Sequence, residues 1–170
     1  FQYWLGGSPE NLESMLLNLA QEFILEDGIA LKQEISEPVL IPDKGIWHPM
    51  APGNAVFETV AEYNNWYNKE HALDADIDVK TATTVGLILQ KSHINTKDEC
   101  HYTALISELE ARGSKVVCIY SGGLDFSGPV NEYFYDKSGV VVDSVINLTG
   151  FALVGGPASQ DHPKAKETLK

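Results

Sequence analysis

The sequence predicts an α/β fold: a flavodoxin-like unit of three or more parallel strands with covering helices, preceded by an acidic helical segment. A nearly continuous apolar run from Thr84 to Gln90, a helical pattern and a second apolar run from Lys115 to Tyr120 follow one another in the order of a βαβ unit. The charge is also uneven, since residues 1–82 hold 14 acids and 4 bases and residues 83–170 hold 10 acids and 8 bases. We therefore divide the chain into 1–82, a helical, proline-interrupted acidic segment, and 83–170, an α/β unit truncated at its C-terminal helix.

The first segment begins with a well-marked helix. Ser8 is a good N-cap, Pro9 suits the first helical position, and apolar residues then recur at three- and four-residue steps as far as Leu25, before a stop signal at Asp27-Gly28. Proline content, helical spacing and acidity give the other assignments in this segment: an extended connection over 29–53, a second helix over 55–68 capped by Asn54, and an acidic linker over 71–83.

The second segment alternates strands and helices. Its helical patterns cover 99–112, which Gly113 ends as a left-handed C-cap, and 129–135, while Asp161-His162-Pro163 starts a last helix. The remaining assignments follow from apolar runs and polar gaps: strands over 84–90, 115–120 and 151–154, a polar loop over 91–98, a turn over 136–139, and an ambiguous strand or short helix over 140–148.

Composition excludes several classes of protein. A formal net charge of −12 opposes binding to nucleic acid phosphates and to anionic membrane surfaces. No apolar run approaches the roughly 18 residues of a membrane-spanning helix. Two cysteines, Cys100 and Cys118, are too few for a disulfide framework and too far apart for the usual zinc pairs, which favours a reducing compartment.

Ligands of open α/β sheets bind outside the carboxyl ends of the strands, which here are the loops 91–98, 121–128 and 155–162. The polar residues in or beside these loops are our candidates for a binding cavity: His93, His101, Asp125, Gln160, Asp161 and His162.

Several candidates can also be explained by a purely structural role. The two histidines His93 and His101 are either ligands or bases brought together by a folded loop, or exposed and capping residues, and Asp161 is explained by helix capping alone. The glycine-rich loops lack a P-loop lysine, and no G-x-S-x-G elbow is present. We assign no catalytic residue, no metal ligand and no cofactor held by the chain itself.

Long strings of this sequence are similar to the large H subunit of magnesium chelatases, which is related to the large cobaltochelatase subunit. They occur in the family's order over nearly the whole chain: Phe1 to Glu13, Ile46 to Pro49, Val85 to Ile94, His101-Tyr102, Glu108 to Val116, Gly122 to Val130 and Leu148 to Pro163. The resemblance, together with a last helix that has no C-cap signal, implies a piece from the N-terminal half of a much longer chain.

The resemblance implies a part of the subunit that binds protoporphyrin IX and at which a ligase inserts Mg²⁺ in an ATP-dependent step of chlorophyll biosynthesis. It implies three protein partners: an AAA+ motor subunit, a bridging subunit and a porphyrin-binding activator protein. It also implies the cytoplasm of a cyanobacterium or the plastid stroma. The expected role is an α/β wall of the porphyrin cavity, in a piece that is inactive alone. The alternatives are a non-catalytic scaffold or docking domain and an independent small-molecule binder.

Overall fold

The computed structural model describes residues 1–26 and 31–170, which form two compact units. The helical unit contains the described part of residues 1–41 together with residues 92–98, and the sheet unit contains residues 42–91 and 99–170. The helical unit holds the helices α1 (Gln2–Gly6) and α2 (Pro9–Phe23), and α5 (Lys91–Thr96) except for its first residue.

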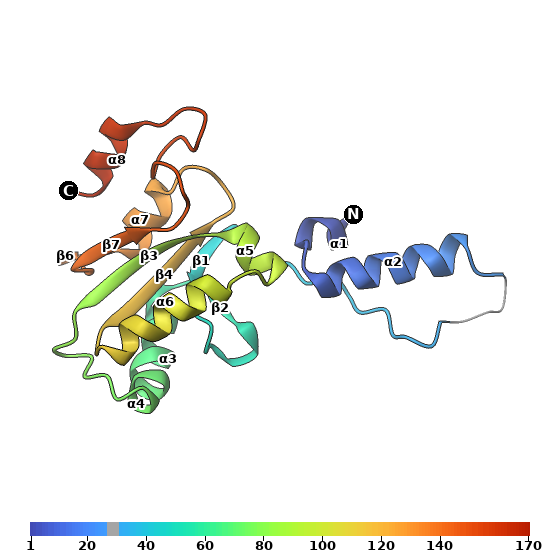
Figure 1. The fold of residues 1–170 in the computed structure, drawn as a ribbon, viewed down its shortest axis with the longest axis horizontal. Coiled ribbons are helices and arrows are strands. Elements are labelled where there is room, and N and C mark those ends of the chain that lie inside the picture. The colour runs from blue at the N-terminus through green and yellow to red at the C-terminus, as the bar shows by residue number, and fades with distance from the viewer. Residues whose placement is uncertain (27–30) are drawn as a thin grey trace. The chain divides into compact units, whose positions relative to one another are not determined.

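A five-stranded sheet with the order β2-β1-β4-β3-β7 is the centre of the sheet unit (Figure 1). Its strands are β1 (Lys44–Trp47), β2 (Val56–Phe57), β3 (Thr84–Gln90), β4 (Lys115–Ser121) and β7 (Ser144–Asn147). Strand β3 pairs in parallel with β4 and with β7, whereas β1 is antiparallel to β4 and β2 is antiparallel to β1. The α/β class and a sheet with three parallel strands are therefore confirmed, although the third of these strands is β7 and not the predicted 151–154.

Helical segments of the sheet unit lie between and after these strands. They are the 3₁₀ turn η1 (Pro52–Asn54), α3 (Val60–Trp66), the π-helical turn η2 (Tyr67–His71), α4 (Ala72–Asp74), α6 (Cys100–Ala111), α7 (Ser127–Tyr133) and α8 (His162–Thr168). The predicted βαβ unit is confirmed, because α6 lies between β3 and β4 in the chain. Gly113 follows α6 with φ 80°, as predicted for a left-handed C-cap. A hairpin of β5 (Tyr135–Asp136) and β6 (Gly139–Val140) contains the predicted turn.

The core lies along the two central strands. Leu87, Ile88 and Leu89 of β3 are fully buried, and so is every residue of β4 from Val116 to Tyr120, each at most 5% exposed. Both strands read as unbroken apolar runs because side chains on both faces are covered, as parallel strands require. This is why the sequence pattern located them to within one residue.

Strands β1 and β2 correct the predicted organisation of the first segment. We expected mostly extended connection over 29–53, yet Ile46 pairs with Ile119 of β4 and with Phe57 of β2. Residues 31–43 form no helix or strand, which agrees with the expectation for that part. Strands of four and two residues between prolines are too short to show an alternating pattern, so the sheet takes strands from both sides of position 82.

Three further predictions differ from the structure. The helix expected over 55–68 begins only at Val60, because Thr59 and Glu62 form a capping box there and Val56 and Phe57 pair with β1 instead. The polar loop expected over 91–98 is mostly the helix α5. Residues 151–154 form no strand: they enter turns in which the carbonyls of Leu153 and Val154 accept from Phe126 and Asp161.

The other assignments hold or are resolved. Ser8 caps α2 by accepting from the Asn11 amide at 3.1 Å, although the stop signal at Asp27-Gly28 lies outside the described residues. The ambiguous stretch 140–148 contains the strand β7, and the expected linker over 71–83 is replaced at its start by the end of η2 and by α4. Among the described residues, no helix is long and apolar enough to cross a bilayer.

Substitution of Gly86 in β3 tests the packing of the sheet. A Cβ atom at Gly86 would lie 2.6 Å from the ring of Phe134, which is 1% exposed and has no room to move away. We expect Gly86→Ala to lower the free energy of unfolding by about 1–3 kcal/mol, measured by urea denaturation. Gly128→Ala is the control, because a Cβ atom there meets nothing within 4 Å. Equal stability of the two variants would contradict this packing.

Asn11 ties α2 to the returning chain within the helical unit. Its side-chain amide donates to the Val39 carbonyl at 2.6 Å and its side-chain oxygen accepts from the Val39 amide at 2.9 Å. We expect Asn11→Ala to cost about 1–3 kcal/mol and to speed hydrogen exchange at the Val39 amide, because two backbone groups lose their partner. Asn18→Ala, at an exposed position of the same helix, should leave that exchange rate unchanged.

Candidate functional site

Four of the candidates predicted from sequence lie in or beside two loops of the sheet unit, the loop after β4 and the loop before α8, which contact each other. They are Asp125, Gln160, Asp161 and His162. The Asp125 carboxylate pairs with the Lys164 Nζ at 3.0 Å, and Asp161 accepts from the Lys164 backbone amide at 3.0 Å. Asp161 is thereby the N-cap of α8, as the capping interpretation predicted. Gln160 and His162 are exposed beside it. Asp125 and Asp161 are thus brought together through Lys164, and both hold local structure.

The two remaining candidates belong to different units. His93 lies in the helical unit with its Nδ1 atom 3.4 Å from the Asp98 carboxylate. His101 is an exposed residue in the first turn of α6, and its ring centroid lies 4.0 Å from that of Tyr102. Neither histidine belongs to the group of three metal-ligand side chains found among the described residues.

That group lies elsewhere in the sheet unit and centres on the carboxylate of Glu110. The Nε2 atom of His48 lies 3.2 Å from Glu110 Oε1, and the Nε2 atom of His71 lies 3.0 Å from each carboxylate oxygen. The Tyr67 hydroxyl donates to Oε1 at 2.6 Å. We call His48, Tyr67, His71 and Glu110 the Glu110 cluster.

Three separate segments position the Glu110 cluster. His48 directly follows β1, Tyr67 and His71 begin and end η2, and Glu110 lies in the last turn of α6. Tyr67 and His71 are four residues apart, and side chains at this spacing lie on one face of a helical segment. In the π turn of η2 both side chains reach the same carboxylate, that of Glu110. Single π turns of this kind are frequent at functional sites.

Burial and hydrogen bonding set the charges in the cluster. Burial raises the pKa of Glu110, but the hydrogen bonds from His48, His71 and Tyr67 outweigh this effect and bring the pKa to about 2, so the carboxylate is ionised. Burial lowers the pKa of His48, against the opposing hydrogen bond to Glu110. Burial and the hydrogen bond to Glu110 raise the pKa of Tyr67, which keeps its proton.

The proton on His48 can be placed from its neighbours. The backbone amide of Met50 donates to His48 Nδ1 at 3.2 Å, so this nitrogen carries no proton. The proton of the neutral ring is therefore on Nε2, and Nε2 donates to Glu110. Glu110 is a buried carboxylate whose charge is met by three donors from two other segments.

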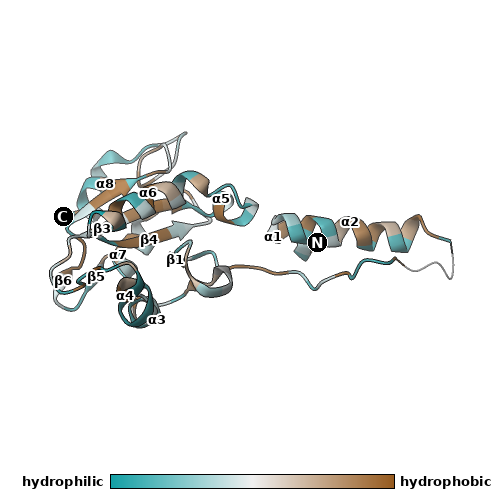
Figure 2. Ribbon diagram, turned by 60° about the horizontal axis from the view of Figure 1, so that its bottom comes forward, coloured by the Kyte–Doolittle hydropathy of each residue, from teal (hydrophilic) through white to brown (hydrophobic). Residues whose placement is uncertain are grey.

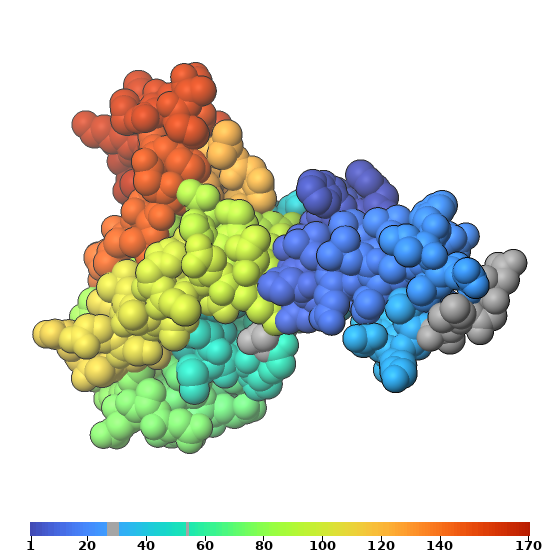
Figure 3. Space-filling model, turned by 45° about the vertical axis from the view of Figure 1, so that its right-hand side comes forward, coloured from blue at the N-terminus to red at the C-terminus, as the bar shows by residue number. Residues whose placement is uncertain are grey.

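Aromatic rings and an open cavity surround the Glu110 cluster. The Trp66 ring stacks on His71 with centroids 5.1 Å apart and an interplanar angle of 20°, and Phe57 stacks on the same indole at 5.3 Å. A cavity of about 500 Å³ opens beside them, with His71 and Glu110 in its wall. Residues near Met50, the segment from Trp66 to Ala75 and the end of α6 line it, and these segments lie side by side on the surface in Figure 3.

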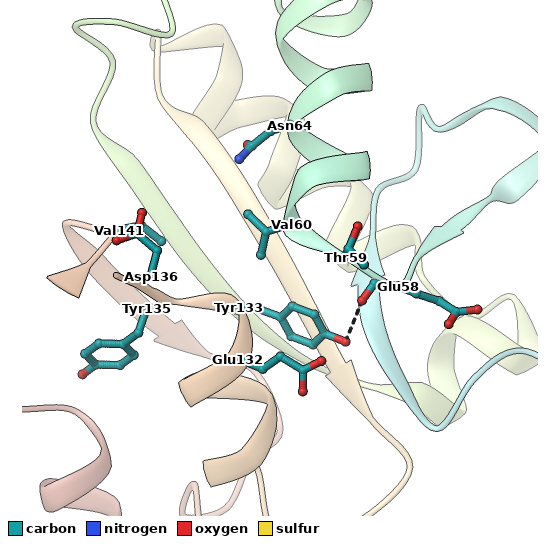
Figure 4. Close-up of a pocket in the computed structure, with 9 residues that line it drawn as sticks. All are labelled: Glu58, Thr59, Val60, Asn64, Glu132, Tyr133, Tyr135, Asp136 and Val141. Carbon is teal, nitrogen blue, oxygen red and sulfur yellow. Dashed lines mark hydrogen bonds between the residues drawn. The ribbon is translucent and has the colours of Figure 1, made fainter. Parts of the chain in front are cut away.

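A second cavity of the sheet unit, of about 380 Å³, lies between α3 and the β5 hairpin (Figure 4). Three carboxylates line it, from Glu58, Glu132 and Asp136, and the Tyr133 hydroxyl donates to the Glu58 carbonyl at 3.3 Å. Lys44 pairs with Glu132. The residues that line this cavity include no histidine, whereas the Glu110 cluster combines two histidines with a buried carboxylate.

Sequence reasoning missed the Glu110 cluster because its members are far apart in the chain. Residues 48, 71 and 110 share no local spacing, and His71 lies in the stretch that looked like a linker. A signal was present, since His48 and Glu110 each fall within strings that carry the family resemblance, Ile46 to Pro49 and Glu108 to Val116.

Comparison with known proteins gives the chain's relatives. The family model described as CobN/Magnesium Chelatase matches residues 1–170. The chain is 48% identical over 172 residues to the chloroplastic magnesium-chelatase ChlH protein of Oryza sativa subsp. indica, covering 99% of this chain and 12% of the relative. It is 34% identical over 169 residues to the magnesium-chelatase H protein of Cereibacter sphaeroides, covering 99% of this chain and 13% of that relative. The chain thus spans about one eighth of the length of these relatives. Because the family model matches every residue, the chain belongs to the CobN/magnesium chelatase family.

Proposed function

We propose that this chain is a scaffold and docking part of the porphyrin-binding H subunit of a magnesium chelatase. In this proposal the complete enzyme inserts Mg²⁺ into protoporphyrin IX with hydrolysis of ATP, in chlorophyll biosynthesis, and the chain alone is inactive. The match of the whole chain to relatives named as magnesium-chelatase H subunits supports it. The proposed partners remain the AAA+ motor subunit, the bridging subunit and the porphyrin-binding activator protein.

The observation that carries the docking role is the orientation of α2. Its buried residues are polar, Asn11 and Ser14, whereas the predicted apolar stripe faces solvent: Leu16 is 63% exposed and Phe23 is 77% exposed. A helix of a globular protein normally turns its apolar stripe toward a core. In Figure 2 brown, hydrophobic segments recur along α2.

More apolar surface of the helical unit continues this pattern. Large side chains of α1, of the end of α2 and of the returning chain are also exposed: Phe1, Trp4, Leu5, Leu19, Ile24, Val39 and Leu40. So many large exposed apolar side chains in one small unit support an interaction surface there. Its occupant, in our proposal, is another segment of the same H subunit, because about seven eighths of the relatives' length lies outside the part that this chain matches.

A second role, the wall of the porphyrin cavity, is favoured by one observation. The loops that follow β4 and precede α8 meet, with Gly156 packed against the Leu124 side chain and Asp125 paired with Lys164. Ligands of open α/β sheets bind at this end of parallel strands. In that role Asp125, Gln160, Asp161 and His162 would face porphyrin.

The proposed location is the plastid stroma or the cytoplasm of a cyanobacterium. The name of the rice relative, which contains the word chloroplastic, supports the first of these.

Replacement of Phe23 in the full-length H subunit tests the docking role. If another segment of the subunit covers α2, Phe23→Ala removes a buried ring and lowers the stability of the isolated subunit by about 3–5 kcal/mol, measured by thermal or urea unfolding. Gln21→Ala on the same helix is the control and should change little. Equal stability of both variants, with loss of motor-subunit binding in Phe23→Ala alone, would show that a partner protein occupies the surface instead.

Porphyrin titration of the full-length subunit separates the two roles. For a scaffold, Asp125→Asn and His162→Ala leave the affinity for a soluble porphyrin within about tenfold of the wild type, that is within about 1.4 kcal/mol, as followed by Soret absorbance and tryptophan quenching. A larger loss in both variants, with unchanged unfolding curves, would establish the cavity wall and reject the scaffold role.

A further inference from the structure

The donor atoms of the Glu110 cluster are spaced for one metal ion. One nitrogen from His48, one from His71 and one carboxylate oxygen of Glu110 all lie within 4.8 Å of one another. Each histidine Nε2 is 3.0–3.2 Å from Glu110 Oε1. Ligands bound at about 2.0–2.1 Å around a tetrahedral Zn²⁺ lie about 3.3 Å apart, which is within a few tenths of an ångström of these two pairs. The histidine nitrogens lie within 4.8 Å of each other and would complete the set by moving closer.

The ligand set selects among metals. Two imidazoles and one carboxylate form the His₂Glu set of zinc sites that keep a fourth position open. Mg²⁺ instead prefers an all-oxygen shell and retains several waters. The cluster therefore suits a borderline-soft transition metal and discriminates against Mg²⁺, the ion that the proposed chelatase would insert.

The surroundings supply the other parts that a metal site needs. The cavity beside His71 and Glu110 gives a path from solvent and space for a water or an outside ligand in the fourth position. The Tyr67 hydroxyl donates to Glu110 Oε1 at 2.6 Å and so restricts the orientation of the carboxylate. The ring of Trp66 stacked on His71 restricts the orientation of that imidazole.

Metal binding changes the tautomer of His48. Its Nε2 must give up its proton, which moves to Nδ1, so the Met50 amide loses its acceptor there. Met50 lies in a turn at an exposed position, and its amide would need a new acceptor. Binding through the Nε2 atom of His71 likewise requires that this nitrogen carries no proton.

We propose that His48, His71 and Glu110 form a binding site for a divalent transition-metal ion of the Zn²⁺ class, separate from the handling of the Mg²⁺ substrate. Without metal the same side chains form a hydrogen-bonded carboxylate, and with metal the two histidines change from donors to ligands. The inference depends on the geometry of the sheet unit and not on the proposed function.

Zinc competition in the full-length, metal-stripped protein tests the site. A chromophoric chelator reports the Zn²⁺ affinity and stoichiometry of the wild type, His71→Ala, Glu110→Gln and the control His101→Ala, which removes an exposed histidine of the same helix as Glu110. We expect His71→Ala and Glu110→Gln each to lose one equivalent of tightly bound Zn²⁺, or to bind it with an affinity reduced by more than the roughly 10–100-fold typical of a change outside the ligand set. His101→Ala should match the wild type. Equal stoichiometry and affinity in all four proteins would overturn the proposal.

Two readouts cover the case in which Glu110→Gln fails to fold. His71→Ala removes a ligand at the cavity wall and keeps the buried carboxylate with two donors, so its circular dichroism and zinc stoichiometry decide. If neither variant folds, Co²⁺ bound to the wild type decides: intense visible d–d bands of a four- or five-coordinate ion, displaced by Zn²⁺ and not by millimolar Mg²⁺, support the site. Weak octahedral bands, or displacement by Mg²⁺, would reject it.

Discussion

A buried carboxylate needs hydrogen-bond donors from the protein itself, and at Glu110 this requirement brings together segments that are far apart in the chain. Glu110 lies in the last turn of α6, in the crossover of the βαβ unit. Its donors come from the end of β1 and from both ends of η2. A buried charge without donors would cost several kcal/mol, so these segments have to converge on one point. The antiparallel side of the sheet and the π turn are thereby joined to its parallel side.

The sequence predicted the parallel strands β3 and β4, left the stretch that contains β7 ambiguous, and gave no indication of the antiparallel strands β1 and β2. Strands β3 and β4 are apolar on both faces, so each shows as an uninterrupted run, and Gly113 marks the end of α6. Strands β1 and β2 are short, and their pairing with residues such as Ile119 is set by contacts far along the chain. Local patterns carry no information about such contacts, and the Glu110 cluster depends on them.

The helix α2 shows a different limit of sequence reasoning. Its start at Pro9 and the spacing of its apolar stripe were predicted correctly. Periodicity states that one face is apolar, but it does not state what that face contacts. In the helical unit the polar Asn11 makes the inward bonds to Val39, and Leu16 and Phe23 point outward. The exposure of the stripe, together with relatives about eight times as long as this chain, supports the proposed docking surface.

Stability alone does not explain why the Glu110 cluster is polar. A buried ionic group can often be replaced by well-packed apolar residues of similar volume at no cost to stability, and sometimes with a gain. Around Glu110 such residues are already present in Phe57, Trp66 and the core of β4, so an apolar filling would be compatible with the fold. Two histidines, a tyrosine and a glutamate occupy the position instead, with their polar atoms directed to one point and a cavity alongside. Because an apolar filling would also suit the fold, four polar side chains directed to one point beside a cavity support the proposed metal site. The candidate loops give the opposite case, since Asp125 and Asp161 are accounted for by Lys164 and by the start of α8.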